Sequence, residues 1–373
     1  MAQTRFLGSG LVMGLALGGL VLLAAAQTGG DRPDGYHVTG TVALPGGGWD
    51  YLGIDTPARR LYVSASTQED VLDADTLKLV GTVADLKGTH GVAISDQDGH
   101  GFTSNGGGNS MTMFDLKTLA AIKEIPLPIQ RPDGIIYDPA TDRVFAFNHA
   151  RAPEHCQAVA VDAKTGAVVG TIELPGEASE YAVADGRGHV YNNMEDTSVE
   201  LEIDARTLKI TQQWPLAPCK NPSGLDMDRK TRRLVIGCHN GMMAFMNADT
   251  GAIVATVPIG GGVDANRFDP ALKLAFSSNG GGRGADGAPA PATITVAHED
   301  GPDHWTVVGN IPTEAGARTM EVDTKTHRLF TVTAKYEPPP PQPAGAQAAA
   351  GGRGRGFRRQ MVPGSFHLIV ISK

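Results

Sequence analysis

Seven polar residues recur at one position of a repeated pattern, and their side chains could bind a ligand or a metal. Each lies five positions before a turn residue, and the turn residues follow one another at intervals of 40 to 54 residues. A purely structural position would more often repeat one small or apolar residue type. The divergence therefore predicts that these positions form a site. The seven residues are Asp50, His90, Asp133, Glu180, Ser223, Asp264 and Arg318.

The repeated pattern also predicts the elements that position these residues. Each copy contains a short apolar strand, a turn and a second strand, as at 50–55 and 60–64. A further strand-turn-strand unit follows in most copies, and an Asp or Asn such as Asp162 or Asn247 opens its turn by binding its own backbone. Four strands in about 40 residues are typical of a propeller blade. We expect an all-β, seven-bladed β-propeller with four-stranded antiparallel blades.

The two ends of the chain are predicted to close the ring. The seventh copy lacks a fourth strand, because the chain ends after the strand pattern at 365–373. The opening segment, 36–44, has the pattern of a fourth strand with no earlier strands of its own. An N-terminal strand that completes the last blade would leave no unpaired edge there. The propeller should therefore span residues 36–373.

Several second strands carry a motif of a known family. The segments 60–64, 143–148 and 189–193 resemble the Arg-x-Tyr-Val-x-Asn strand of the YVTN-repeat, or YncE-like, seven-bladed propellers. The Asp-x-x-Thr-Gly turn at 162–166 is also typical of that family. The resemblance covers about residues 36–373 and implies the fold. It implies no single activity, because such propellers serve many roles.

A ligand site is expected at the mouth of the central channel, where the innermost strand of each blade begins. Four carboxylates that converge there repel one another, so they need a proton or a cation. Carboxylate and amide oxygens suit Ca²⁺ or Mg²⁺. His149, His155 and His239 are weaker metal candidates near the same mouth. The predicted ligand-binding residues are the seven above together with three residues that end second strands, Asn105, Asn148 and Asn279.

Three functions are compatible with this site. The first is a binding protein for a small molecule or a partner protein, because no standard catalytic motif is present. The second is a divalent-metal-dependent hydrolase or lyase, by analogy with lactonase-like propellers. In that case His90 or Asp133 would act as the base. The third is a structural scaffold at the cell envelope. The metal ligands of the second interpretation would be Glu180, Asp264, Asn148 and Asn279.

The N-terminus predicts export. Arg5 precedes an apolar run over 11–26 that ends in three alanines, so residues 1–26 are interpreted as a signal peptide and 27–35 as a linker. The alternative is an uncleaved membrane anchor. No later segment could span a bilayer, so we expect a periplasmic or secreted monomer. The net charge of −8 argues against nucleic acid as a partner.

Two insertions and three cysteines complete the prediction. The insertions at 280–291 and 337–363 are expected to be mobile loops over the mouth, and the second, which carries Arg353 and three further arginines, is either a spacer or a lid for an anionic partner. Cys219 and Cys238 belong to one blade and face the mouth, so they should form a disulfide in an oxidising compartment. Cys156 remains as a free thiol or an intermolecular partner.

Overall fold

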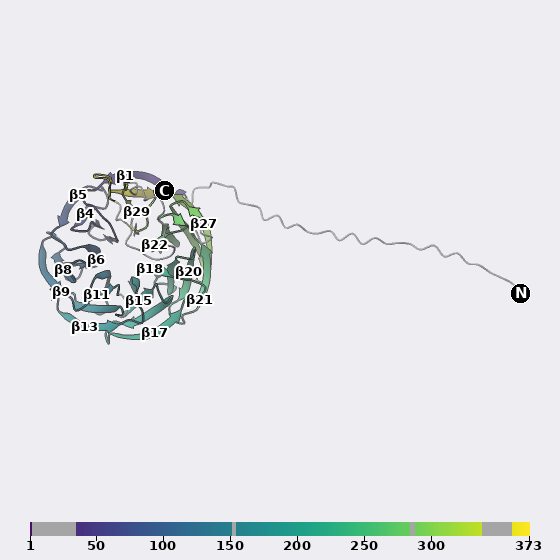
Figure 1. Cartoon of the computed structure of the whole chain (residues 1–373), viewed down its shortest axis with the longest axis horizontal. Helices are drawn as coiled ribbons and strands as arrows, with labels where there is room; N and C mark the ends of the chain where they lie inside the picture. The colour runs from purple at the N-terminus through teal and green to yellow at the C-terminus, as the bar shows by residue number, and fades with distance from the viewer. Residues whose placement is uncertain (2–34, 151–153, 284–287, 338–359) are drawn as a thin grey trace, which may run out of the picture. The chain divides into compact units, whose positions relative to one another are not determined.

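The computed structural model describes residues 1, 35–150, 154–283, 288–337 and 360–373. The strands form seven four-stranded antiparallel sheets, which are arranged as a ring of blades (Figure 1). The predicted all-β, seven-bladed fold is therefore confirmed. Within the described part of the chain, no helix is long and apolar enough to cross a membrane.

Each blade runs outward from an innermost strand to an outermost one. Blade 1 contains β2 (Leu52–Asp55), β3 (Arg60–Ser64), β4 (Glu69–Asp73) and β5 (Leu79–Val83). Blade 2 contains β6 (Thr89–Ser95), β7 (His100–Asn105), β8 (Ser110–Asp115) and β9 (Ala121–Pro126). Blade 3 contains β10 (Pro132–Asp138), β11 (Arg143–Asn148), β12 (Gln157–Asp162) and β13 (Val168–Glu173). Blade 4 contains β14 (Ser179–Ala184), β15 (His189–Met194), β16 (Val199–Asp204) and β17 (Lys209–Pro215).

The remaining blades follow the same order. Blade 5 contains β18 (Pro222–Asp228), β19 (Arg233–Cys238), β20 (Met242–Asn247) and β21 (Ile253–Pro258). Blade 6 contains β22 (Val263–Asp269), β23 (Leu274–Asn279), β26 (Thr293–Gly301) and β27 (His304–Pro312). Blade 7 contains β28 (Met320–Asp323), β29 (Arg328–Thr333), β30 (His367–Ser372) and β1 (His37–Ala43).

The last blade closes the ring as predicted. Strand β1 pairs antiparallel with β30 from His37 opposite Ser372 to Ala43 opposite His367. This pairing joins the two ends of the chain within one sheet and covers the edge that β30 would otherwise leave open. Apolar side chains pack between the blades, and the second strands contribute fully buried aromatic side chains such as Phe145 and Phe276. Ion pairs such as Arg59 with Asp323 also join neighbouring blades.

The repeated turn residues have the predicted local role. Asp55 Oδ1 accepts a hydrogen bond from the backbone N–H of Ala58, 2.8 Å away, in the turn between the first two strands of blade 1. Asp162 Oδ1 accepts from the backbone N–H of Thr165 at 2.8 Å in an outer turn of blade 3. These carboxylates stabilise turns and lie away from the candidate site.

The first insertion is more ordered than the sequence suggested. Its flanks pair as a short two-stranded sheet, β24 (Gly282–Arg283) with β25 (Pro289–Ala290). In the second insertion, Tyr336 forms a bridge with Met361, so the two ends of that loop are held together. Residues 338–359, which include the four arginines, lie outside the described residues.

The cysteines form one disulfide. Cys219 and Cys238 are bonded and their Cα atoms lie 5.5 Å apart, which confirms the predicted pair. Cys156 is a free, fully buried thiol, and burial raises its pKa to about 11. A buried thiol with a raised pKa is a poor partner for a second molecule.

Candidate functional site

The predicted residues lie at or just before the starts of the innermost strands, and these starts meet at one mouth of the central channel. Six of the seven predicted positions line a cavity of about 300 Å³ there. The seventh, His90, reaches the same group through Asp50. The cavity is lined by Asp50, Tyr51, Asp133, His149, Glu180, Ser223, His239, Gly262, Val263, Asp264 and Arg318.

Two carboxylates approach the same ring nitrogen of His90. Its Nδ1 lies 2.6 Å from Asp50 Oδ2 and 3.4 Å from Asp133 Oδ1. The three residues come from successive blades, so this arrangement exists only because the ring brings three strand starts together. An imidazole nitrogen that faces two carboxylates can hold a proton or give it up to a ligand.

A second histidine extends the same pattern. His149 follows directly after β11, and its Nε2 lies 3.3 Å from Glu180 Oε1 and 3.8 Å from Asp133 Oδ2. Acids and histidines therefore alternate over blades 1 to 4. We call this group the acid–histidine arc, and its members are Asp50, His90, Asp133, His149 and Glu180.

Burial makes two acids of the arc hold protons more tightly than usual. Desolvation raises the pKa of Asp50 to about 6, although the hydrogen bond with His90 opposes the shift. Desolvation also raises the pKa of Glu180 to about 7, against the lowering effect of His149. Both carboxyls therefore change their protonation state near neutral pH.

The two histidines are shifted in the direction that favours their charged form. Burial lowers the pKa of His90, but the hydrogen bond to Asp50 and the charge of Asp133 outweigh it and raise the pKa to about 9. Burial also lowers the pKa of His149, but Glu180 and Asp133 outweigh this effect and raise the pKa to about 9. Both imidazoles are thus largely protonated near pH 7.

The other side of the mouth holds an ion pair whose carboxylate is bound through both oxygens. Arg318 Nε lies 2.6 Å from Asp264 Oδ2, and Ser223 Oγ donates a hydrogen bond to Asp264 Oδ1 at 3.1 Å. Both oxygens of Asp264 are therefore engaged by neighbouring blades. The arc, in contrast, has polar atoms left over.

Two buried atoms of the arc make no hydrogen bond within the described residues. They are Asp133 Oδ1 and His149 Nε2. Opposite charges lie near both, but at ion-pair distances of 3.3 to 3.8 Å rather than in hydrogen-bond geometry. Buried polar atoms in native proteins are normally satisfied, so a ligand or ordered water is expected to contact them.

The three predicted asparagines serve a structural role instead. Asn148 donates to the carbonyl of Gln130 at 2.8 Å and accepts from the backbone N–H of Gln157 at 2.7 Å. Asn105 and Asn279 are also almost fully buried and bind side chains of their own blades. None of the three is among the residues that line the mouth cavity. Their amides hold the corner after the second strand, which explains why they recur.

A metal would find a different donor set from the one that the sequence predicted. Asp50, His90 and Asp133 each offer one atom, and these atoms all lie within 4.8 Å of one another. The predicted set relied on Asn148 and Asn279, whose side chains are already hydrogen bonded. Because the group includes an imidazole nitrogen, it suits Mn²⁺, Fe²⁺ or Zn²⁺ better than Ca²⁺ or Mg²⁺.

Tyr51 lines the mouth cavity and packs against Tyr181, which lies deeper in the channel. The rings of Tyr51 and Tyr181 meet edge to face, with their centroids 4.4 Å apart. Glycine at position 91 makes room for this pair, because a Cβ there would lie 2.9 Å from Tyr51 Cδ2. Tyr51 lines cavities on both sides, so the pair separates the mouth from a second space deeper in the channel.

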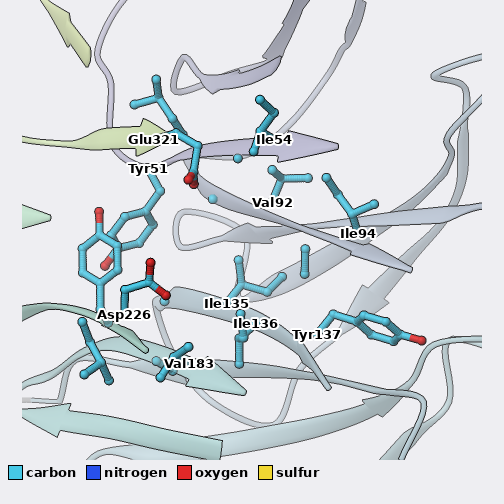
Figure 2. Close-up of a pocket in the computed structure, with 18 of the residues that line it drawn as sticks. Tyr51, Ile54, Val92, Ile94, Ile135, Ile136, Tyr137, Val183, Asp226 and Glu321 are labelled. Carbon is cyan, nitrogen blue, oxygen red and sulfur yellow. The ribbon is translucent and has the colours of Figure 1, made fainter. Parts of the chain in front are cut away.

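The second space, which we call the inner chamber, also has a volume of about 300 Å³. Aliphatic side chains from blades 1 to 4 line much of it, including Ile54, Val92 and Ile135 (Figure 2). Three charged residues from the innermost strands of blades 5 to 7 also face it, namely Asp226, Arg267 and Glu321, together with Arg229 from the turn that follows β18.

The sequence contained a signal for these three residues that the search for strand starts missed. They occupy the fourth position of their innermost strands, counted from Ser223, Asp264 and Arg318. The same position in blades 1 to 4 holds only small or aliphatic residues. Charged residues inside a buried strand are costly unless they are paired, so this contrast marks a second polar site.

Comparisons with known proteins agree with the fold and add no function. No family model matches the chain, and no curated protein matches it in sequence. A chain of the mitotic checkpoint complex superposes with a TM-score of 0.67 at 15% identity, over 88% of this chain and 95% of the other.

Two further structures show the same likeness. A chain of hydrazine synthase from Kuenenia stuttgartiensis has a TM-score of 0.63 and 14% identity, and it matches 79% of this chain and 95% of its own. The β-propeller domain of Cps50 (Swd1) from Myceliophteria thermophila has a TM-score of 0.63 and 12% identity, over 91% of this chain and 99% of the other. At such identities the likeness establishes a β-propeller fold and leaves the chemistry to be argued from the site.

Proposed function

We propose that this propeller is an exported binding protein that captures a small cationic ligand in the mouth cavity. The observation that carries the proposal is the acid–histidine arc, which faces a cavity of about 300 Å³ with two buried polar atoms left without hydrogen bonds among the described residues. Cavities of this size with a few convergent polar groups are the usual form of a small-molecule site.

The charges around the mouth favour a cation. When ionised, the four carboxylates are opposed by Arg318 and by two protonated histidines, which leaves one negative charge. A cation adds to this balance directly and also displaces protons from His90 and His149. An anion would meet the carboxylates of the arc and would have only Arg318, which Asp264 already binds.

Thermal unfolding of the purified protein, prepared without chelator, tests this proposal. The probes are Mn²⁺, Zn²⁺ and putrescine, with acetate and succinate as matched anions. At least one cation should raise the unfolding temperature, and the shift should be lost in Glu180→Gln. Stabilisation by the anions alone, or by none of the probes, would contradict the proposal.

A second candidate is a metal-dependent hydrolase or lyase. The specific observation that favours it is the close approach of donor atoms from Asp50, His90 and Asp133. With a divalent ion bound there, Glu180 and His149 would remain beside it as a base that could activate water. The metal would polarise the substrate and lower the pKa of bound water.

Metal content and hydrolysis separate the two candidates. If the protein is the enzyme, mass spectrometry should find a stoichiometric transition metal that is absent from Asp133→Asn. Lactone or ester hydrolysis should then fall in Glu180→Gln while the metal stays bound. Bound metal without any hydrolysis supports the binding protein. No bound metal argues against the enzyme.

Export is the remaining part of the proposal. Residues 2–26 of the interpreted signal lie outside the described residues. The disulfide between Cys219 and Cys238 supports an oxidising compartment. Expression of the full chain should give a periplasmic or secreted product whose N-terminus starts at residue 27. A cytoplasmic product of unchanged mass would contradict this part. We also propose that the protein is a monomer, which size-exclusion chromatography with light scattering would test.

A further inference from the structure

The inner chamber has one apolar wall. Innermost strands of blades 1 to 4 contribute aliphatic side chains, and Figure 2 shows Ile54, Val92, Ile94 and Ile135 around the same space. Val183 from blade 4 continues this wall. Such a surface favours an apolar ligand body, because its contact with water is removed when a ligand enters.

The opposite wall is charged. Arg267 donates from Nε to Glu321 Oε1 at 3.0 Å and from Nη1 to the carbonyl of Asn266 at 2.7 Å. Asp226 accepts backbone hydrogen bonds from Met227 on Oδ1 and from Phe268 on Oδ2, both at 2.8 Å. These contacts fix the positions of two carboxylates and one guanidinium around the chamber.

This wall retains capacity to bind a ligand. Among the described residues, neither bond of the Arg267 guanidinium uses Nη2, and both bonds of Glu321, from Arg267 and from the backbone N–H of Val322, fall on Oε1. Tyr181 is 6% exposed, and its hydroxyl is buried without a hydrogen bond among the described residues. A buried hydroxyl without a partner costs free energy that a polar ligand group could recover.

The chamber is reached from the face opposite the mouth. An outer cavity of about 620 Å³ shares Ile54, Asp226, Arg229 and Glu321 with it. Exposed residues of the turns between first and second strands, such as Lys230, line that outer cavity. Because Tyr51 and Tyr181 close the other end, a ligand would enter past the shared charged residues.

We propose that the inner chamber is a second binding site, for a small zwitterion with an apolar body, of the chemical class of the apolar amino acids. Two carboxylates, Asp226 and Glu321, face an ammonium group, and two guanidinium groups, of Arg267 and Arg229, face a carboxylate. The formal charges of these four residues cancel, which matches a ligand that carries both charges. The aliphatic wall receives the ligand side chain.

The size of the chamber limits the ligand. Binding pockets for small molecules usually start at about 300 Å³, so the chamber takes a molecule near the lower end of that range. A single amino acid with a branched or aromatic side chain meets this limit. The site is separate from the mouth, so it does not depend on the function proposed there.

Calorimetric titration of the purified protein with four related compounds tests the proposal. L-Leucine carries both charges, 4-methylpentanoate lacks the ammonium, 3-methylbutylamine lacks the carboxylate, and 4-methylpentanamide carries no charge. We expect leucine to bind at one site per chain, and each of the other three to bind at least about tenfold more weakly, because each lost charge-assisted hydrogen bond has that effect.

Variants locate the binding. Asp226→Asn keeps an oxygen acceptor but removes the charge, so it should weaken leucine binding by about tenfold to a hundredfold. Ile136→Trp fills the chamber and should abolish binding. This second variant keeps the test decisive if Asp226→Asn is poorly folded. Asp264→Asn at the mouth is the control and should leave leucine affinity unchanged. Equal affinity for all four compounds, no binding of leucine, or unchanged leucine affinity in both chamber variants would overturn the proposal.

Discussion

The mouth and the inner chamber are two levels of the same seven strands, and they divide the ring in opposite ways. At the mouth, blades 1 to 4 carry the titratable acid–histidine arc, whereas blades 5 to 7 carry the settled group of Ser223, Asp264 and Arg318. In the chamber, blades 1 to 4 are apolar and blades 5 to 7 carry the charges. The repeat fixes where a side chain points, and the divergence of each position fixes its chemistry.

The two levels also differ in how strongly their ion pairs should stabilise the fold. The Arg318–Asp264 pair is at the mouth, where the arginine side chain is 51% exposed. The Arg267–Glu321 pair lies in the channel wall, with side chains 12% and 13% exposed. Solvent screens the first pair much more than the second.

The largest expected effect follows from that difference. Arg267→Met removes the guanidinium that pairs with Glu321 in the channel wall, and it should lower the free energy of unfolding by about 3–5 kcal/mol. Arg318→Met, the matched variant at the mouth, should cost less than about 1 kcal/mol. Urea unfolding monitored by circular dichroism measures both. Equal losses would show that the two levels do not differ in burial as described.

The disulfide gives the next largest effect and concerns the mouth. Cys238 ends β19 directly before His239, which lines the mouth cavity. Removing the bond by the paired change Cys219→Ser and Cys238→Ser should cost about 3 kcal/mol, because the closed loop of 19 residues then adds entropy to the unfolded chain. The same unfolding assay measures it, with Cys156→Ser as a thiol control. A loss below about 1 kcal/mol would mean that this loop is already restricted in the unfolded chain when the bond is absent.

The smallest effect is a pH dependence that arises from the mouth. The pKa of His149 is raised to about 9 in the folded state, above the 6.5 that is usual for a histidine. The folded state therefore binds this proton more tightly, and the resulting stability is present below pH 6.5 and lost as pH rises to about 9. Because the side chain is partly exposed, we expect a change on the order of 1 kcal/mol.

The variant His149→Gln should reduce that pH dependence. Stability of the wild type and of the variant is measured by urea unfolding from pH 6 to pH 9, with His304→Gln as a control on an exposed outer strand. The control should keep the wild-type slope. A wild type that becomes more stable over this range would have the wrong sign for the described contacts.

The fold was predictable because each blade repeats the same turn and strand signals. Residues such as Asp162 locate the turns, and the aromatic residues locate the second strands. Both signals are local in the sequence and need no knowledge of distant contacts. Ring closure by β1 also followed, since an unpaired strand at each end can only be satisfied by the other. The repeated local signals therefore predicted nearly all of the architecture.

The site was predictable only in part. The seven strand starts meet as expected, but His149 lies just after a second strand and falls outside the repeated position. The sequence does not distinguish two roles of Asn148 and its equivalents, because a recurring polar residue can hold a corner or bind a ligand, and the hydrogen bonds show the first role. The contact between Tyr51 and Tyr181 joins blades 1 and 4, and no local pattern reports it.

Cation titration at the mouth tests the central claim most directly. Calorimetry with Mn²⁺, Zn²⁺ and putrescine, at pH 6.5 and pH 8.5, should show one site per chain for at least one cation, with tighter binding at the higher pH because His90 and His149 lose their protons more readily there. Asp133→Asn should remove the site and Asp226→Asn should leave it intact. Absence of binding by all three cations, or binding that Asp133→Asn leaves unchanged, would contradict the account.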